Sequence, residues 1–411
     1  MADVSHIPGL IARPLLFALY GISGMIRRDP RIWAFGSWSG QRYADNSAAL
    51  FEYVAGLQDS DISPVWISHD RTIVARLRDQ GFEAYHAWSL GGLWATARSG
   101  ILIYDGLTKD INHWVSRGAK RVLLRHGIGI KNIERAIDNK NHRLYKLFYG
   151  NGLQRLFWHV LIPWHNLRPD LSIATSKDHA TQGGQYFGIG SDRIVITGFP
   201  RNDRLVSPGT EIADREISAV IARARATDKP VWLYMPTFRD DDSRFPMPLA
   251  QLTELATELN IMLLIKLHFV DAKRNSFSQR ENTDSFHSVD PRLDAQVLYP
   301  VVDGLISDYS SSPFDFILTG NPVILFTPDM EEYQKYSRSF YYDFDEIRPG
   351  PRVSTLGELK EVLLIAIEQG NAVCQPEYDR ALKRFHQYRD SGSCQRTFTT
   401  IYQRFVSQDD D

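Results

Sequence analysis

The stretch Val301–Phe326, "VVDGLISDYSSSPFDFILTGNPVILF", indicates how the chain folds. An apolar run at 304–306 ends in a hydroxyl-rich turn at 307–312, and apolar residues at helical spacing follow it. A second apolar run then begins at Val323. This succession predicts a strand, a helix and a second strand, and such units form parallel sheets that are buried on both faces.

The hydroxyl-rich turn has two interpretations. Serine and aspartate side chains cap the free N–H groups of a first helical turn. A helix N-terminus can also bind a phosphate group through those same N–H groups and its partial positive charge. One residue is enough for a cap, whereas this turn contains Asp308, Tyr309 and three serines at 310–312. The turn by itself leaves both interpretations open.

The same alternation of apolar runs and helical patterns extends over the chain. The runs lie at 32–35, 65–67, 101–104, 121–124, 171–174, 194–197, 231–234, 261–267, 305–306 and 323–326. They predict an α/β protein with two facing Rossmann-like domains, an architecture like that of GT-B transferases, and with an active-site cleft between the domains.

The domain boundaries follow from breaks in this alternation. We expect an N-terminal apolar or amphipathic segment at 1–29, a first domain at 30–207, a second at 211–375, and a C-terminal helical segment with an acidic tail at 376–411. Arg13 and two prolines interrupt the apolar N-terminal segment. It is therefore expected to lie on a membrane surface or on the protein itself, and the sequence leaves this choice open.

Composition excludes several classes of protein. At 411 residues, with 43% hydrophobic and 23% charged residues, the chain has the composition of a two-domain globular protein. Its 47 basic residues nearly balance 49 acidic ones, so its charge does not indicate nucleic-acid binding. Two cysteines, Cys374 and Cys394, form no disulfide framework or zinc motif and are typical of a cytosolic protein.

In the N-terminal half, polar residues follow two predicted strands. Gly36 follows the first strand, and Asp45 and Asn46 begin the next helix, on the side where we expect the acceptor. His126 follows the strand at 121–124, and Lys131 lies further along the same loop. An imidazole at a strand end beside a cleft is placed to act as a general base near neutral pH.

In the C-terminal half, the corresponding residues suit an anion. Thr237 and Arg239 follow the strand at 231–234, and His268 follows the strand at 261–267. With the serine-rich turn, they predict a site for a nucleotide-linked substrate with two negative charges. The chain has neither the ATPase P-loop nor the glycine fingerprint of dinucleotide-binding domains.

Several stretches resemble those of a known family. "LRHGIGIKNI", "ITGFPRND", "LYMPTFRDD", "LIKLH" and "ISDYSSSPFDFILTGNPVILFTPDMEEY" are similar, in this order, to motifs of the CDP-glycerol glycerophosphotransferases. That family contains teichoic acid primases and polymerases and related capsule enzymes. The resemblance covers about Trp33 to Arg396.

The resemblance implies specific roles. His126 matches the catalytic base, and His268 matches a second catalytic histidine near the donor pyrophosphate. The residues expected to bind the donor are Thr237, Arg239, Ser310, Ser311, Asp315, Glu331 and Glu332. Ile128 and Phe269 stand where the family has threonine and proline, so the loops around both histidines depart from the family pattern.

The implied reaction is the transfer of glycerol phosphate from CDP-glycerol to a hydroxyl of a glycan or polymer acceptor, with release of CMP. The acceptor is expected to be lipid-linked, and no cofactor or metal ion is assigned. Alternatives are a transferase of the same fold that uses CDP-ribitol or a nucleotide sugar, and a non-catalytic scaffold of surface-polymer assembly. His126 and His268 at strand ends argue against the scaffold.

The stretch 140–169 contains no acidic residue. Its cations and large aromatic residues are Lys140, Arg143, Lys146, Arg155, Arg168, Tyr145, Phe148, Tyr149, Phe157, Trp158 and Trp164. Such a combination is typical of helices on an anionic bilayer surface, and it also suits an amphipathic helix packed on its own domain. We favour the membrane, which predicts an enzyme bound peripherally to the inner face of the cell membrane.

Overall fold

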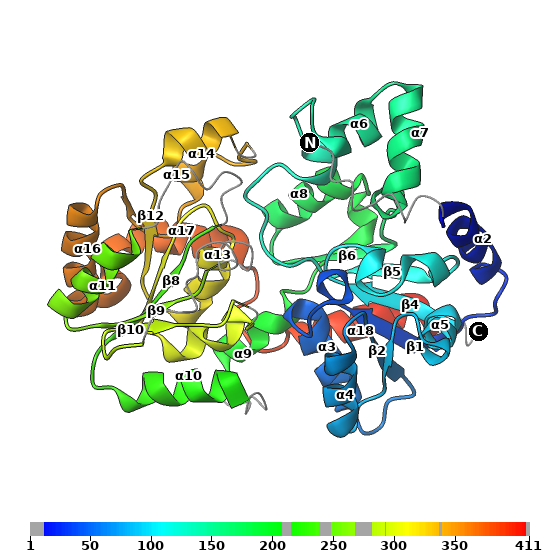
Figure 1. Cartoon of the computed structure of the whole chain (residues 1–411), viewed down its shortest axis with the longest axis horizontal. Helices are drawn as coiled ribbons and strands as arrows, with labels where there is room; N and C mark the ends of the chain where they lie inside the picture. The colour runs from blue at the N-terminus through cyan, green and yellow to red at the C-terminus, as the bar shows by residue number, and fades with distance from the viewer. Residues whose placement is uncertain are drawn as a thin grey trace. The chain divides into compact units, whose positions relative to one another are not determined.

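The computed structural model describes residues 12–207, 215–237, 248–267, 282–291, 293–336 and 339–407. Within these ranges the chain forms two compact α/β units (Figure 1). Unit 1 contains the described residues of 1–126, 134–203 and 392–411, and unit 2 contains those of 127–133 and 204–391. The prediction of two α/β domains with parallel sheets is confirmed.

Unit 1 is built on a seven-stranded parallel sheet in the order β3-β2-β1-β4-β5-β6-β7. Its strands are β1 (Asp29–Gly36), β2 (Ser63–Ser68), β3 (Ala84–His86), β4 (Ser99–Tyr104), β5 (Lys120–Leu123), β6 (Leu171–Ala174) and β7 (Ile194–Ile196). At the centre, Ala34 of β1 lies opposite Val65 of β2 and Leu102 of β4, and all three side chains are buried. Continuous apolar runs form these strands because helices cover both faces of the sheet.

The helices of unit 1 are α2 (Arg13–Ser23), α3 (Asp45–Ala55), α4 (Arg71–Asp79), α5 (Leu90–Arg98), α6 (Arg143–Tyr149), α7 (Gly152–Leu161), α8 (Lys177–Phe187) and α18 (Ser393–Phe405), and the short helix α9 (Asp203–Val206) begins at the end of the unit. Most of these helices alternate with the strands along the chain, whereas α2 precedes β1 and α18 comes from the C-terminal part of the chain. Figure 1 shows α18, from the C-terminal part of the chain, beside α3. Helix α2 packs its aromatic side on the unit: Phe17 meets Trp114, and Tyr20 stacks on His113.

Unit 2 has a six-stranded parallel sheet in the order β10-β9-β8-β11-β12-β13. Its strands are β8 (Val231–Met235), β9 (Met262–Ile265), β10 (Phe286–Ser288), β11 (Gly304–Ser307), β12 (Val323–Phe326) and β13 (Arg352–Val353). Its helices are α10 (Arg215–Ala226), α11 (Leu249–Glu258), α13 (Ser312–Phe316), α14 (Met330–Tyr336), α15 (Phe344–Ile347), α16 (Leu356–Gln369) and α17 (Gln375–Phe385). One core cluster joins the sheet to the buried sides of α11 and α16.

Two parts of the chain depart from the predicted domain boundaries. Residues 127–133, expected in the first domain, pack within unit 2, where Asn132 N donates to the Ser339 carbonyl at 2.9 Å. Helix α18, expected in a separate C-terminal segment, packs within unit 1, where the Asp203 carboxylate accepts from the backbone N of Ser393 and Cys394, both at 2.8 Å. Both corrections rest on hydrogen bonds between residues far apart in sequence, which local patterns do not encode.

Candidate active site

The loops that follow β1, β4 and β5 lie together at the carboxyl edge of the unit 1 sheet. These three strands are neighbours and run parallel, so their loops emerge side by side. The loop after β1 contains Trp38, the loop after β4 begins with Asp105, and the loop after β5 contains His126. This edge therefore unites residues that are between 20 and about 90 positions apart in the chain.

His126 is exposed on a loop that is anchored tightly just before it. Arg125 has a left-handed backbone, with φ of 64°. Its buried guanidinium donates to Gln182 Oε1 at 3.0 Å and to the His179 carbonyl at 3.2 Å, both on α8. The imidazole ring lies 5.8 Å, centre to centre, from the ring of Trp38. An exposed imidazole on a fixed backbone is suited to proton transfer with a bound substrate.

The structure places Asp45 and Asn46 beside the His126 loop and buries both. Asp45 Oδ1 pairs with Arg201 Nη1 at 2.5 Å, and Asp45 Oδ2 accepts from Trp38 Nε1 at 3.1 Å. Asn46 Nδ2 donates to the Arg125 carbonyl at 2.8 Å. We predicted that both residues contact the acceptor. Their burial instead indicates that they build the framework around His126.

Gly36 also proves to be a packing residue. A Cβ atom at this position would lie 2.3 Å from the Asp110 carbonyl oxygen, so only glycine allows the end of β1 to approach the loop after β4. The Asp110 carboxylate accepts from Ser39 N at 2.7 Å and from Gly106 N at 2.8 Å. Trp38 and Ser39 both have positive φ, at 48° and 57°. Strained backbone of this kind collects at functional sites.

Two further carboxyl groups are buried at this edge, Asp105 and Asp110. Burial raises the pKa of Asp105 well above its ordinary range, and the nearby Asp45 raises it further. Asp105 Oδ1 accepts from Ser47 N, on α3, at 3.0 Å. Burial also raises the pKa of Asp110, although the N–H groups of Ser39 and Gly106 oppose that shift.

In unit 2, one carboxylate joins two of the predicted donor motifs. Asp308, directly after β11, accepts from the backbone N of Thr237 at 2.8 and 3.0 Å. Since Thr237 follows β8, this contact fixes the loop after β8 to the serine-rich turn after β11. Ser310 Oγ accepts from Ser312 N at 3.1 Å and so caps α13, whereas the Ser311 side chain makes no capping bond. The turn thus contains a cap and a second hydroxyl outside it.

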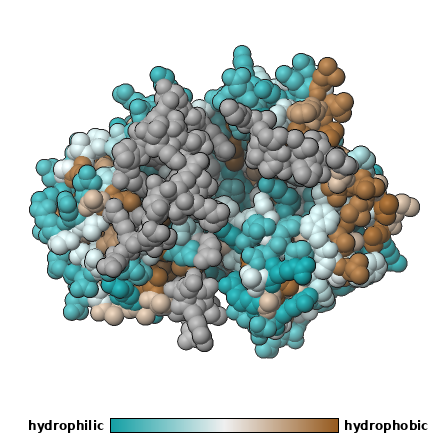
Figure 2. Space-filling model, viewed as in Figure 1, coloured by the Kyte–Doolittle hydropathy of each residue, from teal (hydrophilic) through white to brown (hydrophobic). Residues whose placement is uncertain are grey.

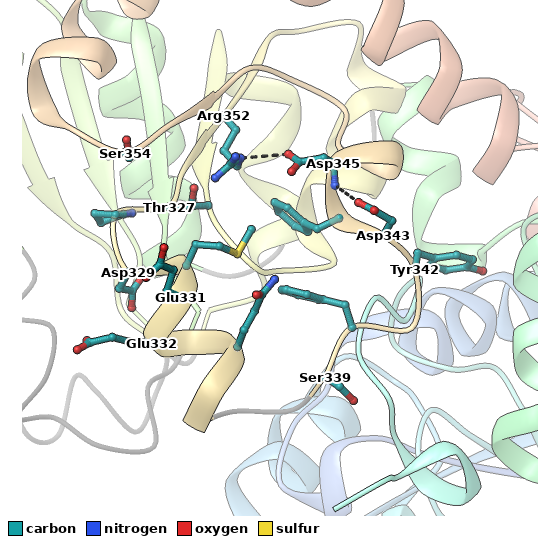
Figure 3. Close-up of a pocket in the computed structure, with 15 residues that line it drawn as sticks. Thr327, Asp329, Glu331, Glu332, Ser339, Tyr342, Asp343, Asp345, Arg352 and Ser354 are labelled. Carbon is teal, nitrogen blue, oxygen red and sulfur yellow. Dashed lines mark hydrogen bonds and ion pairs between the residues drawn. The ribbon is translucent and has the colours of Figure 1, made fainter.

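A pocket of about 1040 Å³ opens beside the carboxyl ends of β12 and β13 (Figure 3). Glu331 and Glu332 line it from the start of α14, as Figure 3 shows. Asp329, also in the lining, accepts from Tyr309 Oη at 3.0 Å. Across the pocket, Arg352 pairs with Asp345 at 3.1 Å. The pocket is therefore rich in carboxylates that can accept hydrogen bonds from a ligand.

The remaining predicted residues divide into three groups. Asp315 is buried, accepts from Gln296 Nε2 at 3.3 Å and lies outside the pocket lining. Lys131, predicted on the acceptor side, lies within unit 2, with Nζ 4.9 Å from the ring centre of Tyr333. Arg239 and His268 lie outside the described residues. Among the described residues, no group of three or more histidine, cysteine or acidic side chains could hold a metal ion.

Sequence reasoning did not select Trp38, Asp105 or Arg201. Asp105 and Arg201 both follow apolar runs closely, at 101–104 and 194–197, so the strand-end criterion that selected His126 also applies to them. Trp38 stands two positions after Gly36 in the sequence, but only the structure places its ring against His126.

Comparison with known proteins places these features in context. The family model for CDP-glycerol:poly(glycerophosphate) glycerophosphotransferase matches residues 20–403. A teichoic acid glycerol-phosphate transferase of Staphylococcus aureus is 26% identical over 388 residues, which cover 90% of this chain and 92% of that protein. A teichoic acid poly(glycerol phosphate) polymerase of Bacillus subtilis is 27% identical over 84% of this chain, which spans 44% of that polymerase.

The solved structure of the wall teichoic acid polymerase TagF, in one of its variants, has the same fold. It aligns with a TM-score of 0.77 over 98% of this chain and 97% of the TagF chain, at 21% identity.

The substitution Asp105→Asn is expected to stabilise the protein at neutral pH. Because burial raises the pKa of Asp105 in the folded protein, the stabilisation from its bound proton is fully present below its ordinary pKa of 3.8. It is lost as the pH rises through the pKa of the folded state. Asparagine carries no charge at any of these pH values. The free energy of unfolding of the Asp105→Asn protein should therefore increasingly exceed that of the unchanged protein as the pH rises. Urea denaturation at about pH 5 and about pH 8 measures this difference.

Asp110→Asn is the matched control. Both oxygens of Asp110 accept from backbone N–H groups, so an amide nitrogen there would face a donor and should destabilise the protein at both pH values. An Asp105→Asn advantage that is equal at the two pH values would contradict the expectation.

Proposed function

The chain belongs to the CDP-glycerol:poly(glycerophosphate) glycerophosphotransferase family, whose members transfer glycerol phosphate from CDP-glycerol in teichoic acid synthesis, and from that premise we propose a role for each of its units. Unit 2 binds the donor, and His126 of unit 1 activates the acceptor hydroxyl. The products are CMP and an acceptor longer by one glycerol phosphate.

The hydrogen bond from Thr237 N to the Asp308 carboxylate is the main support for a donor site in unit 2. It unites the loop after β8 with the turn that contains Ser310 and Ser311, two segments about 70 residues apart. Hydroxyl groups and N–H groups gathered at a strand edge suit phosphate oxygens. We assign the donor phosphates to this edge, with Thr237 and Ser311 as ligands.

Arg239 and His268 complete this assignment by their position in the chain. Arg239 comes four residues after the end of β8, and His268 three residues after the end of β9. A forked guanidinium and an imidazole are both donors that stabilise the negative charge which develops on CMP as it leaves. We therefore keep both residues as donor-site residues, with His268 also in a catalytic role.

The acidic pocket suits the cytidine end of the donor. The cytosine amino group donates hydrogen bonds, and carboxylates accept from it. The ribose hydroxyls also donate. Glu331 and Glu332, in the pocket lining, are assigned to these groups. Asp315, buried against Gln296, is assigned to support of the turn instead of direct donor contact.

The proposed chemistry is one displacement at phosphorus. The acceptor oxygen forms a bond to the donor phosphorus that carries glycerol, while the bond from that phosphorus to the CMP oxygen breaks. His126 receives the proton of the acceptor hydroxyl. A positioned base of this kind contributes about 10²- to 10⁴-fold to the rate. Positioning and electrostatic stabilisation by the donor site supply much of the rest.

The comparisons favour glycerol over ribitol in the donor. The two glycerol-phosphate relatives match over 84% and 90% of this chain. Two ribitol-phosphate polymerases match over 46% and 53% of it, at 27% and 29% identity. We therefore place CDP-ribitol second.

Unit 1 has an exposed apolar face that suits a membrane surface. On α7, the exposed fractions of Leu153, Leu156 and Phe157 are 81%, 62% and 56%. Figure 2 shows apolar surface, in brown, over α7 and over α2. None of the helices in the described ranges has the length and apolarity needed to cross a membrane.

Cations accompany this face. Arg143 on α6 and Arg155 on α7 are both exposed, and α6 and α7 pack against each other. We propose that α7 and α2 lie on an anionic bilayer and bring unit 1 to a lipid-linked acceptor. Neither Cys374 nor Cys394 forms a disulfide bond, which suits the inner face of the membrane.

Release of CMP tests the catalytic proposal. Purified protein with CDP-glycerol should release CMP only when a lipid-linked disaccharide or glycerol phosphate oligomer is present. His126→Ala should lower kcat by about 10²- to 10⁴-fold, because the acceptor hydroxyl loses its base. Release that needs no acceptor, or a His126→Ala protein with full activity, would contradict the assignment. The same assay with CDP-ribitol identifies the preferred donor.

Two pairs of substitutions in the same assay test the donor pocket. Glu331→Gln with Glu332→Gln should raise the KM for CDP-glycerol about tenfold, because two acceptors for donor hydrogen bonds are lost. Glu361→Gln with Glu368→Gln, on the exposed side of α16, removes the same charge elsewhere and should leave KM unchanged.

Flotation with phosphatidylglycerol vesicles tests the membrane face. The triple substitution of Leu153, Leu156 and Phe157 by serine should lower vesicle binding at least about tenfold, because it removes apolar area that would leave water. Leu364 and Ile365 are also exposed, on α16 of unit 2, and their substitution by serine is the matched control. If the triple variant binds as well as the unchanged protein, α7 is not the membrane contact.

A further inference from the structure

We propose that Asn46 is a positioning residue for His126, because its side-chain amide holds the strained peptide from which the imidazole projects. This proposal rests on the role of His126 as the base. It assigns Asn46 to the transfer step, although Asn46 does not touch the substrate.

The strain lies at Arg125. Its φ of 64° is in the left-handed region, where a Cβ atom crowds the following carbonyl oxygen and strains the backbone. Such a conformation persists only where surrounding contacts determine it. The guanidinium is held on α8 by Gln182 and the His179 carbonyl. These two contacts hold the side chain of Arg125, so a further contact is needed to hold its backbone in the left-handed conformation.

Asn46 supplies that contact. Its Nδ2 donates to the Arg125 carbonyl at 2.8 Å, and its Oδ1 accepts from Arg201 N at 3.1 Å. The side chain is completely buried, with an exposed fraction of 0%. The Arg125 carbonyl belongs to the peptide that begins His126, so the amide fixes the direction in which the His126 backbone leaves the loop.

The same network reaches the imidazole from a second side. The indole N–H of Trp38 donates to Asp45 Oδ2 at 3.1 Å, and its ring lies against that of His126. Asp45 itself pairs with Arg201. Asn46 and Asp45 are consecutive residues at the start of α3, and Arg201 contacts both. The network of Asp45, Asn46 and Arg201 therefore fixes the peptide before His126 and also the Trp38 ring that lies against the imidazole.

Loss of the Asn46 amide frees the Arg125 peptide to relax toward an ordinary backbone conformation. That relaxation rotates the following residue and displaces the imidazole. A displacement of about 1 Å in a reacting group can cost about 10²-fold in rate. Since unit 2 holds the donor, donor binding should not depend on this contact.

Kinetics of two Asn46 variants test the proposal, with donor and acceptor as in the CMP assay. Asn46→Ala removes both hydrogen bonds. Asn46→Asp keeps the shape and the acceptor for Arg201 N but turns an oxygen toward the Arg125 carbonyl. Each should lower kcat by about 10²-fold and leave the KM for CDP-glycerol within about twofold. The isosteric variant serves if the alanine variant does not fold.

Asn112→Ala is the matched control. Asn112 is buried in unit 1, donates through Nδ2 to the Ala87 carbonyl at 2.9 Å, and accepts from Trp114 N at 3.1 Å. It thus loses the same kinds of bond as Asn46→Ala, in loops that do not include His126. Its thermal stability should fall comparably, while kcat stays within about threefold.

A double-mutant cycle separates positioning from other effects. In a His126→Ala background, Asn46→Ala should change the residual rate by less than about threefold, because the group that it positions is gone. A full 10²-fold loss in that background, or normal kcat in both Asn46 variants, would overturn the proposal. If His126→Ala alone were fully active, the base assignment itself would fall, and that outcome is distinct from the other two.

Discussion

Every strand pair in the described sheets is parallel, and this constraint decides where polar chemistry can gather. The strands are mostly apolar and largely buried, so polar side chains that could meet a ligand gather mainly in the loops that follow them. Each strand must also be joined to the next by a crossover, which places the loops after neighbouring strands at one edge. His126 and Asp105 in unit 1, and Thr237 and Asp308 in unit 2, occupy such edges.

Carboxyl groups gather near both sheet edges, but their surroundings differ. In unit 1 the carboxyl groups are buried, so each needs partners: Asp45 has Arg201 and the Trp38 indole, and Asp110 has backbone N–H groups. This arrangement is rigid, and it surrounds an exposed imidazole. In unit 2 the carboxylates of Glu331 and Glu332 remain exposed in a pocket. Rigid framework suits proton transfer, and exposed acceptors suit recognition of a polar donor.

Local patterns predicted much of this fold, for physical reasons. Continuous apolar runs marked each long buried strand, but the short strands β3, β10 and β13 were missed. All three lie at sheet edges. An edge strand packs against fewer neighbouring elements, so its sequence can be less apolar. The antiparallel pairing of Lys131 with Phe340 was also unpredictable, because it joins residues about 200 positions apart.

The candidate site could also be predicted only in part from the sequence. Strand ends selected His126 and the serine-rich turn, since topology alone places them at an edge. The same criterion selected Asn46 but assigned it to the acceptor, because sequence does not show that its amide is buried against the Arg125 carbonyl. Residue type and position thus predicted which residues lie near the site. Which of their side chains are exposed to a ligand depends on packing and is seen only in the structure.

The configuration of the transferred phosphorus tests the direct attack most sharply. CDP-glycerol with one sulfur placed stereospecifically on the phosphorus that carries glycerol would make that centre chiral. If the acceptor hydroxyl, activated by His126, displaces CMP in one step, the product phosphorus should have inverted configuration. Retention would mean two displacements, with a covalent intermediate on a protein side chain, and would contradict a role for His126 as a base in a single step.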